Sequence, residues 1–375
     1  MQAESLNCPT GQFSLVRPGS PEKMPLRAWD AADEYLIEHV SEQFPNVPLT
    51  ILNDGFGALA CALNQQISAW HTDSYCAKQA LALNTERNDL SALTQVCSST
   101  DPLSNDTRCV VMKIPKNTSY LTYQLQEIQQ LAISEQRTIN VILAGMMKHL
   151  PKTLLDTLGK FGAVNRLPFK KKAMLLRLEI SPSEAHQPPA KYPKQHSFFK
   201  TSILGHANVF GRDKLDQGTE LLLANMPSIE GHHLAADLCC GTGILGLNHA
   251  KAHPDCQIDF YDESYMAVDC AQQGIGLNNL TNPSNACWDD GMKHAQENQY
   301  DLILCNPPFH EQHAVGDHIA WRLFNDAKRS LKAGGKLIIV GNRHLGYHTK
   351  LKRLFGNSQS VASNSKFVVL QSIKK

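Results

Sequence analysis

The sequence predicts an α/β protein built from two tandem copies of one fold, each with a mostly parallel sheet and an antiparallel last strand. Short apolar runs alternate with segments of helical periodicity, which is the order that parallel sheets with crossover helices produce. The alternation restarts near residue 200, after a proline-rich stretch. Four motifs recur in the same order in both halves, as expected of a long internal repeat.

Length and composition fit two soluble domains. A chain of 375 residues lets each half bury a core of its own. Hydrophobic residues make up 42% and charged residues 19%, and no apolar run reaches about 18 residues. The start of the chain lacks the basic-then-apolar pattern of a signal peptide. We therefore expect a cytoplasmic protein with no membrane partner.

The cysteines, histidines and net charge limit the kinds of site. The 11 cysteines lack paired C-x-x-C spacing and the 16 histidines lack H-E-x-x-H spacing, so free thiols and no metal are expected. A net charge of +1 does not announce a nucleic-acid binder, but it does not exclude one, because binding depends on a local basic surface. Basic residues gather over 148–172 and again over 350–366.

In the first half, residues 1–24 are polar and contain proline and glycine, so we expect a loosely ordered start. Periodicity then predicts a helix over 26–40 and further helices ending near 84 and spanning 121–133. Short apolar runs predict strands over 48–52, 67–71, 109–112 and 139–143.

A connection between domains is predicted over 181–200, which holds four prolines and few aliphatic residues. We place the domains at 1–185 and 186–375. The second half predicts helices ending near 224 and 278, starting at 244, and spanning 321–331. Its predicted strands are 234–238, 257–261, a short one ending at 288, 302–305, 336–340 and 366–373.

The repeat is visible when the halves are aligned, with spacing kept to within a few residues. Each motif of the first half has its counterpart in the second. The pairs are 51–57 with 237–243, 73–75 with 263–265, 114–116 with 306–308, and 148–150 with 343–345.

A strand, a glycine turn and a helix around 237–246 predict a nucleotide-type binding loop. Glycines let the backbone approach a ligand, and the free N–H groups at the helix start favour a polar group. Asp262, at the end of the next strand, is placed to accept two ribose hydroxyls. Residues 241–246 also satisfy G-x-G-x-x-G, so the loop alone leaves a dinucleotide dehydrogenase open. Asp237 favours instead a ligand with a cationic amino group, such as S-adenosylmethionine.

The stretch Asn306-Pro307-Pro308-Phe309 follows a buried strand and carries the predicted chemistry. Two prolines fix the backbone, so the Asn306 side chain and the Pro307 carbonyl can hold both N–H bonds of a planar amine during attack on a methyl group. Phe309 is placed to stack on the ring of the target. An ordinary strand exit is the alternative. Ile114 stands for Asn306 in the first copy, which shows that the fold does not require the motif.

These motifs resemble the class I S-adenosylmethionine-dependent methyltransferases, which have a Rossmann-like fold. The resemblance rests on DLCCGTG, the acid at 262, Asp289-Asp290 and NPPF, in that order. The resemblance is more specific to the ribosomal RNA guanine-N2 methyltransferases. Two further motifs carry it, HANVFGRDKLDQGT before the first motif and GNRHL after NPPF. In that family a duplicated fold keeps one active copy. The large-subunit branch is the more similar, and the small-subunit branch is its near neighbour. The match covers roughly residues 25–375.

The resemblance implies a role for each matching residue. The cofactor S-adenosylmethionine would be held by Asp237, Cys239, Gly241, Gly243, Asp262 and Asp290, with Asp289 the less favoured choice for the adenine. Asn306, Pro307, Pro308 and Phe309 would form the catalytic stretch. Cys239 departs from the family's first glycine and would be strained if φ must be positive.

The first copy is expected to be degenerate and to bind ribosomal RNA, the expected partner. Ile51, Ile114 and Lys116 replace the residues that the chemistry needs. A purely stabilising scaffold is the alternative. The candidate RNA-binding residues are Lys113, Lys116, Lys148, Lys170, Lys171, Lys172 and, in the second copy, Arg343. No feature sets the oligomeric state, and a monomer is the working expectation.

The leading function is methylation of N2 of a guanine in large-subunit ribosomal RNA. The same chemistry on small-subunit RNA is the first alternative. Protein-glutamine methylation suits the same motif, but the duplication argues against it. A non-enzymatic RNA-binding module is contradicted by the intact Asp237, Asp262 and Asn306.

Overall fold

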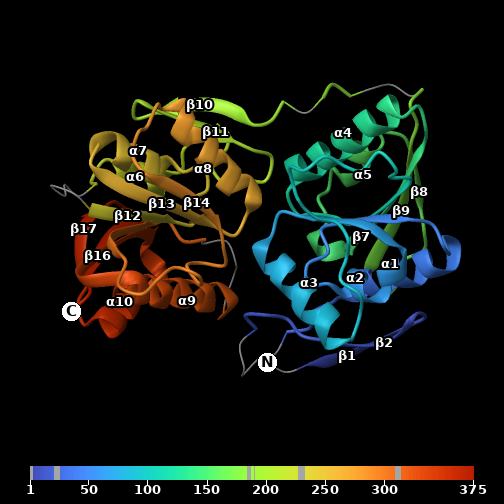
Figure 1. The fold of residues 1–375 in the computed structure, drawn as a ribbon, viewed down its shortest axis with the longest axis horizontal. Helices are drawn as coiled ribbons and strands as arrows, with labels where there is room; N and C mark the ends of the chain where they lie inside the picture. Colours follow the sequence, from blue (N-terminus) through green and yellow to red (C-terminus); the bar gives the residue numbers. More distant parts are fainter. Residues whose placement is uncertain (1–2, 21–25, 184–186, 190, 227–232, 309–313) are drawn as a thin grey trace. The chain divides into compact units, whose positions relative to one another are not determined.

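The computed structural model describes residues 3–20, 26–183, 187–189, 191–226, 233–308 and 314–375. The chain divides into two compact units, Met1–Lys191 and Tyr192–Lys375, each with a seven-stranded sheet. Figure 1 shows the first unit in blue to green and the second in yellow-green to red. The predicted fold class is confirmed in both units. Within the described residues, no helix is long and apolar enough to cross a membrane.

The sheet of the first unit has the strand order β5-β4-β3-β6-β7-β9-β8. Strands β5 to β7 are parallel, and β9 is antiparallel to both β7 and β8. The strands are β3 Leu49–Leu52, β4 Ile67–Thr72, β5 Val96–Ser98, β6 Cys109–Lys113, β7 Ile139–Met146, β8 Ala163–Arg166 and β9 Ala173–Ile180. The helices are α1 Ala31–Gln43, α2 Ala58–Ala62, α3 Tyr75–Arg87, α4 Thr118–Ser134 and α5 Leu154–Leu158, with 3-10 turns η1 Asn64–Gln66 and η2 Met147–His149.

The second unit repeats this order as β14-β13-β12-β15-β16-β18-β17, again with antiparallel β18 and β17. The strands are β12 His233–Leu238, β13 Cys256–Asp262, β14 Ser284–Trp288, β15 Tyr300–Cys305, β16 Leu331–Asn342, β17 Gln359–Ser363 and β18 Phe367–Ile373. The helices are α6 Gln217–Leu223, α7 Ile244–Ala252, α8 Tyr265–Leu277, α9 Ala314–Ser330 and α10 Tyr347–Phe355, with the 3-10 turn η3 Arg343–Leu345.

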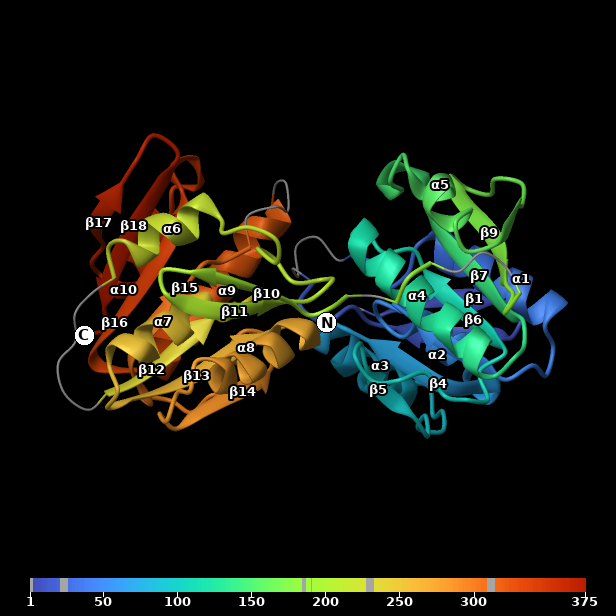
Figure 2. The ribbon, with the colours of Figure 1, turned by 90° about the horizontal axis from the view of Figure 1, so that it is seen from above.

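Helices cover both faces of the second sheet. Apolar residues of α6, α7 and α8 form one core layer with β12, β13, β15 and β16, and those of α9 and α10 form the other. Figure 2 shows α6 alongside β16 and β18. Successive strand residues alternate between these two layers. The carboxyl ends of the parallel strands therefore meet at one edge, where polar side chains can gather.

Two expectations about unstructured segments are wrong in part. Residues 1–24 were expected to be loosely ordered, but β1 Glu4–Cys8 and β2 Gly11–Leu15 form an antiparallel hairpin with Leu6 and Leu15 buried. The expected connection over 181–200 similarly contributes β10 Lys194–Phe198, which pairs with β11 Thr201–Gly205. The apolar residues in these hairpins are too few to reveal a strand by pattern alone.

Each hairpin is held by an asparagine that caps the helix after the second sheet strand. Asn278 accepts from the Ser202 N–H at 2.9 Å and donates to the Ser202 carbonyl at 2.7 Å. Asn88 makes the same pair with the Ser14 N–H and carbonyl, at 2.7 and 2.9 Å. The repeat therefore extends to the hairpin that precedes each sheet.

The predicted helix over 26–40 begins later, at Ala31, because Asp30 caps α1. The Asp30 side chain accepts from the N–H groups of Ala32 and Asp33, and the Asp33 side chain in turn accepts from the Asp30 N–H. This reciprocal capping box fixes the start of the helix. Among the strands of the two seven-stranded sheets, β5, β8, β9 and β17 lie outside the predicted set.

Candidate active site at the carboxyl edge of the second sheet

The predicted glycine loop joins β12 to α7 and has left-handed backbone at three positions, Cys239 (φ 60°), Gly241 (φ 54°) and Gly243 (φ 76°). A Cβ on Gly243 would lie 3.1 Å from the Ala271 Cβ, so this glycine lets α7 pack closely on α8. A Cβ on Gly241 would meet only the Phe210 carbonyl oxygen, at 3.6 Å. The loop thus combines a tight turn with an uncrowded side on which a ligand can lie.

Cys239 occupies a backbone conformation that favours glycine, as the strain argument anticipated. A hydrogen bond with the Cys305 thiol and burial together raise the pKa of Cys239 well above its ordinary value. The neutral thiol packs with the core layer of α9 and α10. We infer that this contact offsets part of the strain of the positive φ.

Asp237 is fully buried at the end of β12. One carboxylate oxygen accepts from the Gly246 N–H in α7 at 2.8 Å, while Oδ1 has no partner among the described residues. Burial raises the pKa of Asp237 to about 8. A buried carboxyl oxygen without a partner is costly, and a cationic group beside it would remove that cost.

Asp262, at the end of β13, connects the second strand to the glycine loop. Its Oδ2 accepts from the Gly241 N–H and its Oδ1 from the Ser264 N–H, both at 2.9 Å. The carboxylate therefore lies directly against the glycine loop.

The acids after β14 have partners of their own. Asp290 binds the Arg322 guanidinium of α9 with both oxygens, with a 2.5 Å bond from Nη2 to Oδ1. Asp289 accepts from the backbone N–H and the ring Nδ1 of His294, at 2.9 and 2.8 Å. Asp290 thus lies at the carboxyl edge of the sheet, and its carboxylate is paired with Arg322. No sequence motif pointed to Arg322, which lies 32 residues further along the chain.

Asn306 directly follows β15 and is held by α6. Its Nδ2 donates to the Thr219 hydroxyl at 2.8 Å, which fixes the rotation of the amide. Its Oδ1 is buried and accepts no hydrogen bond from the described residues. Pro307 is buried, Pro308 is exposed, and Phe309 lies outside the described residues. The structure therefore presents a fixed, unused acceptor where the sequence predicted one.

The first unit shows what replaces this arrangement in the degenerate copy. Asp33 is the third residue after the N-cap of α1, as Thr219 is the third residue after the N-cap of α6. The Asp33 carboxylate forms an ion pair with Lys113, at the end of β6, at 2.8 Å. Asn53, with φ of 63° at the position of Cys239, donates to the Lys113 carbonyl and to Gln124. An ion pair and an amide pair fill the edge that remains available in the second unit.

The prediction that Lys113 binds RNA therefore needs a correction. The lysine side chain is only 17% exposed and also binds Asp30 at 2.7 Å. A lysine in a buried ion pair with two carboxylates has no free charge to offer a phosphate.

The other predicted basic residues of the first unit lie at the carboxyl edge of its sheet. Lys116 follows β6, Lys148 follows β7, and Lys172 precedes β9, whose first residue pairs with Met146. All three are exposed, and the described residues include no carboxylate paired with them. Burial, then the charges of Lys116 and Lys148, lower the pKa of His149, so these two lysines share one neighbour.

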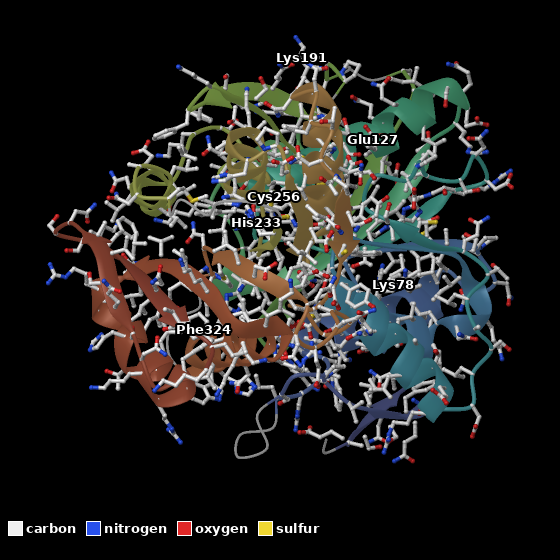
Figure 3. The ribbon with its side chains drawn as sticks, turned by 60° about the vertical axis from the view of Figure 1, so that its left-hand side comes forward. Lys78, Glu127, Lys191, His233, Cys256 and Phe324 are labelled. Atoms are coloured by element: carbon white, nitrogen blue, oxygen red, sulfur yellow. The ribbon has the colours of Figure 1, made fainter. Side chains whose placement is uncertain are left out.

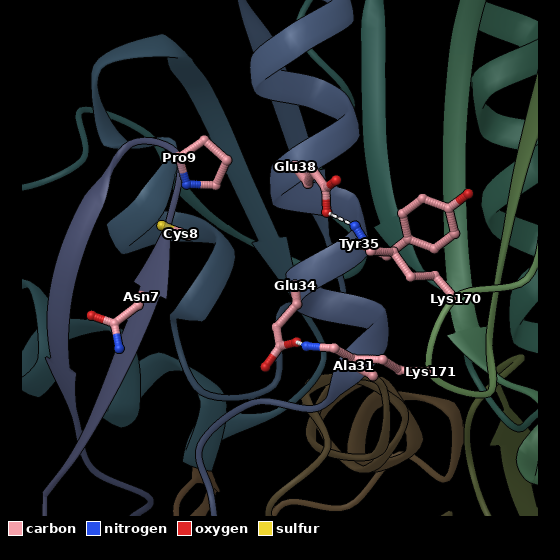
Figure 4. Close-up of a pocket in the computed structure, with 9 residues that line it drawn as sticks. All are labelled: Asn7, Cys8, Pro9, Ala31, Glu34, Tyr35, Glu38, Lys170 and Lys171. Atoms are coloured by element: carbon pink, nitrogen blue, oxygen red, sulfur yellow. Dashed lines mark hydrogen bonds and ion pairs between the residues drawn. The ribbon is translucent and has the colours of Figure 1, made fainter.

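Lys170 and Lys171 are exposed but have acidic partners on α1. Figure 4 shows Lys170 paired with Glu38 and Lys171 paired with Glu34, around a small pocket beside β1. Their charge is partly neutralised. Arg343, in the second unit, is exposed at the end of β16 and donates to the Asn364 carbonyl at 3.2 Å.

A cluster of histidines lies at the opposite, amino edge of the second sheet. His233, His249 and Cys256 place potential ligand atoms within 4.8 Å of one another, and Figure 3 labels His233 and Cys256 at the starts of their strands. The sequence spacing gave no sign of this group. The two histidine Nε2 atoms lie 2.8 Å apart and satisfy each other as a hydrogen bond.

The fold and the site define a methyltransferase. Residues 200–371 match the family model described as methyltransferase small domain. Residues 3–183 match the RLMG N-terminal domain.

The chain belongs to the family of ribosomal RNA large subunit methyltransferase G. It is 42% identical to the family member from Stutzerimonas stutzeri, covering 98% of this chain and 99% of that protein. It is 41% identical to the member from Shewanella denitrificans, covering 97% and 100%. The expected resemblance to the large-subunit branch is confirmed.

A solved structure shares the fold over the whole chain. It is the 16S rRNA N2 G1207 methyltransferase (RsmC) of T. thermophilus, in complex with AdoMet and guanosine. The TM-score is 0.77 with 20% sequence identity, and the match covers 100% of this chain and 98% of that one. At this identity the likeness concerns the fold alone.

Proposed function

We propose that this protein transfers a methyl group from S-adenosylmethionine to N2 of a guanine in large-subunit ribosomal RNA. The observation that carries the proposal is the buried Asn306 Oδ1, which is fixed by Thr219 and has no partner in the described protein. A buried acceptor of this kind calls for a donor from a ligand. An exocyclic amine, with two N–H bonds, suits one amide oxygen and one neighbouring carbonyl.

The residues present fit S-adenosylmethionine. The unpaired Asp237 Oδ1 suits a cationic amino group, and the open side of Gly241 suits close approach of a ligand. Asp262 lies against the same loop, where it can accept ribose hydroxyls. Cys239 and Gly243 shape the turn, and Asp290, which is paired with Arg322, would lie near the adenine. When bound, the cofactor supplies an electrophilic methyl group on a positively charged sulfur.

The protein contributes by positioning the nucleophile. The lone pair of a guanine amine is delocalised into the ring, which makes it a poor nucleophile. Asn306 Oδ1 and the Pro307 carbonyl can accept its two hydrogens and favour the pyramidal nitrogen that attacks. With the cofactor bound, transfer would form the new N–C bond and break the C–S bond, and the surplus proton of the amine would pass to solvent. Positioning and fixed dipoles account for this catalysis without a strong base.

The first unit is proposed to bind RNA phosphates through its carboxyl edge. Lys116, Lys148 and Lys172 supply exposed charge there, with smaller contributions from the paired Lys170 and Lys171. Arg343 offers a cation beside the proposed catalytic edge of the second unit. Phosphate contacts of this kind orient a substrate and carry no sequence information.

The decisive experiment measures methyl transfer from labelled S-adenosylmethionine to separate, unmodified large- and small-subunit ribosomal RNAs, followed by mapping of the modified base. We expect label in N2-methylguanine of the large-subunit RNA. Asn306→Ala should reduce transfer by at least about a hundredfold while cofactor affinity stays within about twofold. Label in small-subunit RNA, or in a protein glutamine, would replace the proposed substrate. Full activity of Asn306→Ala would refute the role of the amide.

A further inference from the structure

Asn342, the last residue of β16, has a buried side-chain oxygen that neither the fold nor the roles assigned above account for. Its Oδ1 has no hydrogen-bond partner among the described residues, as is also true of Asn306 Oδ1. Unsatisfied buried amide oxygens are rare in native proteins, and each needs an explanation. Two of them at the ends of adjacent strands suggest one common ligand.

The register of the sheet places the two asparagines on the same face. Cys305 pairs with Ile339, so Asn306 follows opposite Val340, and Asn342 lies two residues further along β16. Side chains alternate along a strand, so Asn342 shares the face of Val340, whose side chain packs in the core layer of α6. Asn306 also faces α6, because it donates to Thr219.

Helix α6 also lies close to both Asn306 and the ladder partner of Asn342. A Cβ on Gly218 would lie 3.2 Å from the Phe367 ring, and Phe367 is the ladder partner of Asn342. The next residue, Thr219, holds Asn306. Strand spacing and rise put the two asparagine Cα atoms roughly 8 Å apart, a span that two amide side chains and one base edge can fill.

The degenerate copy shows that the fold does not need this asparagine. The pairing of 148–150 with 343–345 places Met147 at the position of Asn342. The sheet register agrees, because Lys113 pairs with Ala144 as Cys305 pairs with Ile339. The first copy therefore lacks both amides, with Ile114 in place of Asn306 and methionine in place of Asn342. Loss of both in the same copy indicates that they serve one function.

We propose that Asn342 reads the N1–H and O6 edge of the target guanine while Asn306 holds its N2 amine. The proposal rests on the proposed function. The Asn342 oxygen can accept from N1–H, and its amide nitrogen can donate to O6, the adjacent atom pair on that edge. Adenine presents an acceptor at N1, which would leave the buried oxygen facing another acceptor. The pair of amides therefore selects guanine.

The test measures the binding of three nucleosides to the protein loaded with S-adenosylhomocysteine, by NMR titration. Guanosine presents every group, inosine lacks the N2 amine, and 2-aminopurine riboside lacks N1–H and O6. In the wild type we expect guanosine to bind roughly tenfold more tightly than 2-aminopurine riboside. In Asn342→Ala the preference for guanosine over 2-aminopurine riboside should fall to about twofold or less. The preference for guanosine over inosine, which depends on the N2 amine and Asn306, should be the same as in the wild type.

Two further measurements separate this role from a structural one. Asn342→Asp, which keeps an acceptor oxygen, should retain most of the preference for guanosine. Asn342→Ala should keep normal cofactor affinity and lose roughly 10- to 100-fold in kcat/KM on ribosomal RNA. An unchanged preference in Asn342→Ala, or no preference in the wild type, would overturn the proposal. If the wild type discriminates the nucleosides but methylates no ribosomal RNA, the proposed substrate fails and the reading of guanine stands.

Discussion

At the scale of single residues, the site depends on polar atoms whose hydrogen bonds are only partly used. Asn306 is held by one side of its amide and is open on the other. Asp237 likewise accepts from the Gly246 N–H with one oxygen, and its other oxygen has no partner among the described residues. In each case one hydrogen bond fixes the side chain, and one acceptor oxygen remains open to the ligand of the proposed function. This is how a rigid site can be built without closing it.

Thr219 is expected to act on catalysis through Asn306. Thr219→Val keeps the shape of the side chain but removes the oxygen that accepts from Asn306 Nδ2, so the amide can rotate away from the target amine. We expect kcat to fall about tenfold, corresponding to about 1.4 kcal/mol, with cofactor affinity unchanged. Single-turnover methyl transfer measures the effect. Thr219→Ser, which keeps the hydroxyl, is the matched control, and equal rates in both variants would contradict this role.

Cofactor affinity is expected to depend on pH through Asp237. Burial raises the pKa of this carboxyl from 3.8 to about 8, so below about pH 8 it is mostly neutral in the free protein. A cationic amino group favours the carboxylate, so binding should release a proton and tighten as pH rises. Affinity should increase several-fold from about pH 6 to about pH 7.5. Calorimetry with S-adenosylhomocysteine can measure it. Asp237→Asn, which can still accept from Gly246, should bind more weakly and show a flatter profile.

At the scale of elements, the same devices recur in both units, which separates what the fold requires from what the chemistry requires. The capped helix, the positive φ after the first sheet strand and the asparagine clamp on the hairpin occur in each unit. The Thr219–Asn306 bond occurs only in the second. In the first unit the Asp33–Lys113 ion pair takes its place. We infer that the shared features are structural and that the feature that differs belongs to the proposed active site.

The asparagine clamps are expected to stabilise each unit by a similar amount. Asn278→Ala would remove both bonds to Ser202 and leave its half-buried backbone N–H and carbonyl without the amide. We expect a loss of roughly 1–3 kcal/mol in the free energy of unfolding. Asn88→Ala should cost about as much in the first unit. Urea unfolding followed by tryptophan fluorescence measures both, and a change below about 0.5 kcal/mol in Asn278→Ala would show that the clamp is dispensable.

At the scale of the whole molecule, the proposed function assigns the chemistry to the second copy of the fold and the binding of the substrate to the first. The carboxyl edge of the first sheet is filled by paired side chains, and its exposed lysines lie around that edge. The carboxyl edge of the second sheet keeps unpaired acceptors at Asp237, Asn306 and Asn342. The first unit keeps the fold with Ile114 at the position of Asn306, so the fold does not require that amide.

RNA affinity should respond to the lysines at the carboxyl edge of the first unit. Lys116→Glu, Lys148→Glu and Lys172→Glu each remove a candidate phosphate contact. Each should weaken binding of ribosomal RNA and lower the slope of log affinity against log salt by about 1. Lys160→Glu is the control, because this exposed lysine lies just before β8, towards the amino edge. Equal effects at Lys160 and Lys148 would show that the RNA contacts are not confined to this edge.

The sequence by itself determined the two copies of the fold, the parallel strands and the position of Asn306-Pro307 at a strand end. These features are local, since periodicity, glycine turns and prolines act over a few neighbouring residues. Only the tertiary structure decided which side chains meet. Thr219 and Asn306 are 87 residues apart, Asp30 and Lys113 are 83 apart, and Arg322 reaches Asp290 from another helix. Such pairings depend on the packing of helices against the sheet, which no local pattern encodes. For that reason the sequence placed Lys113 on an RNA-binding surface, and the fold placed it in an ion pair.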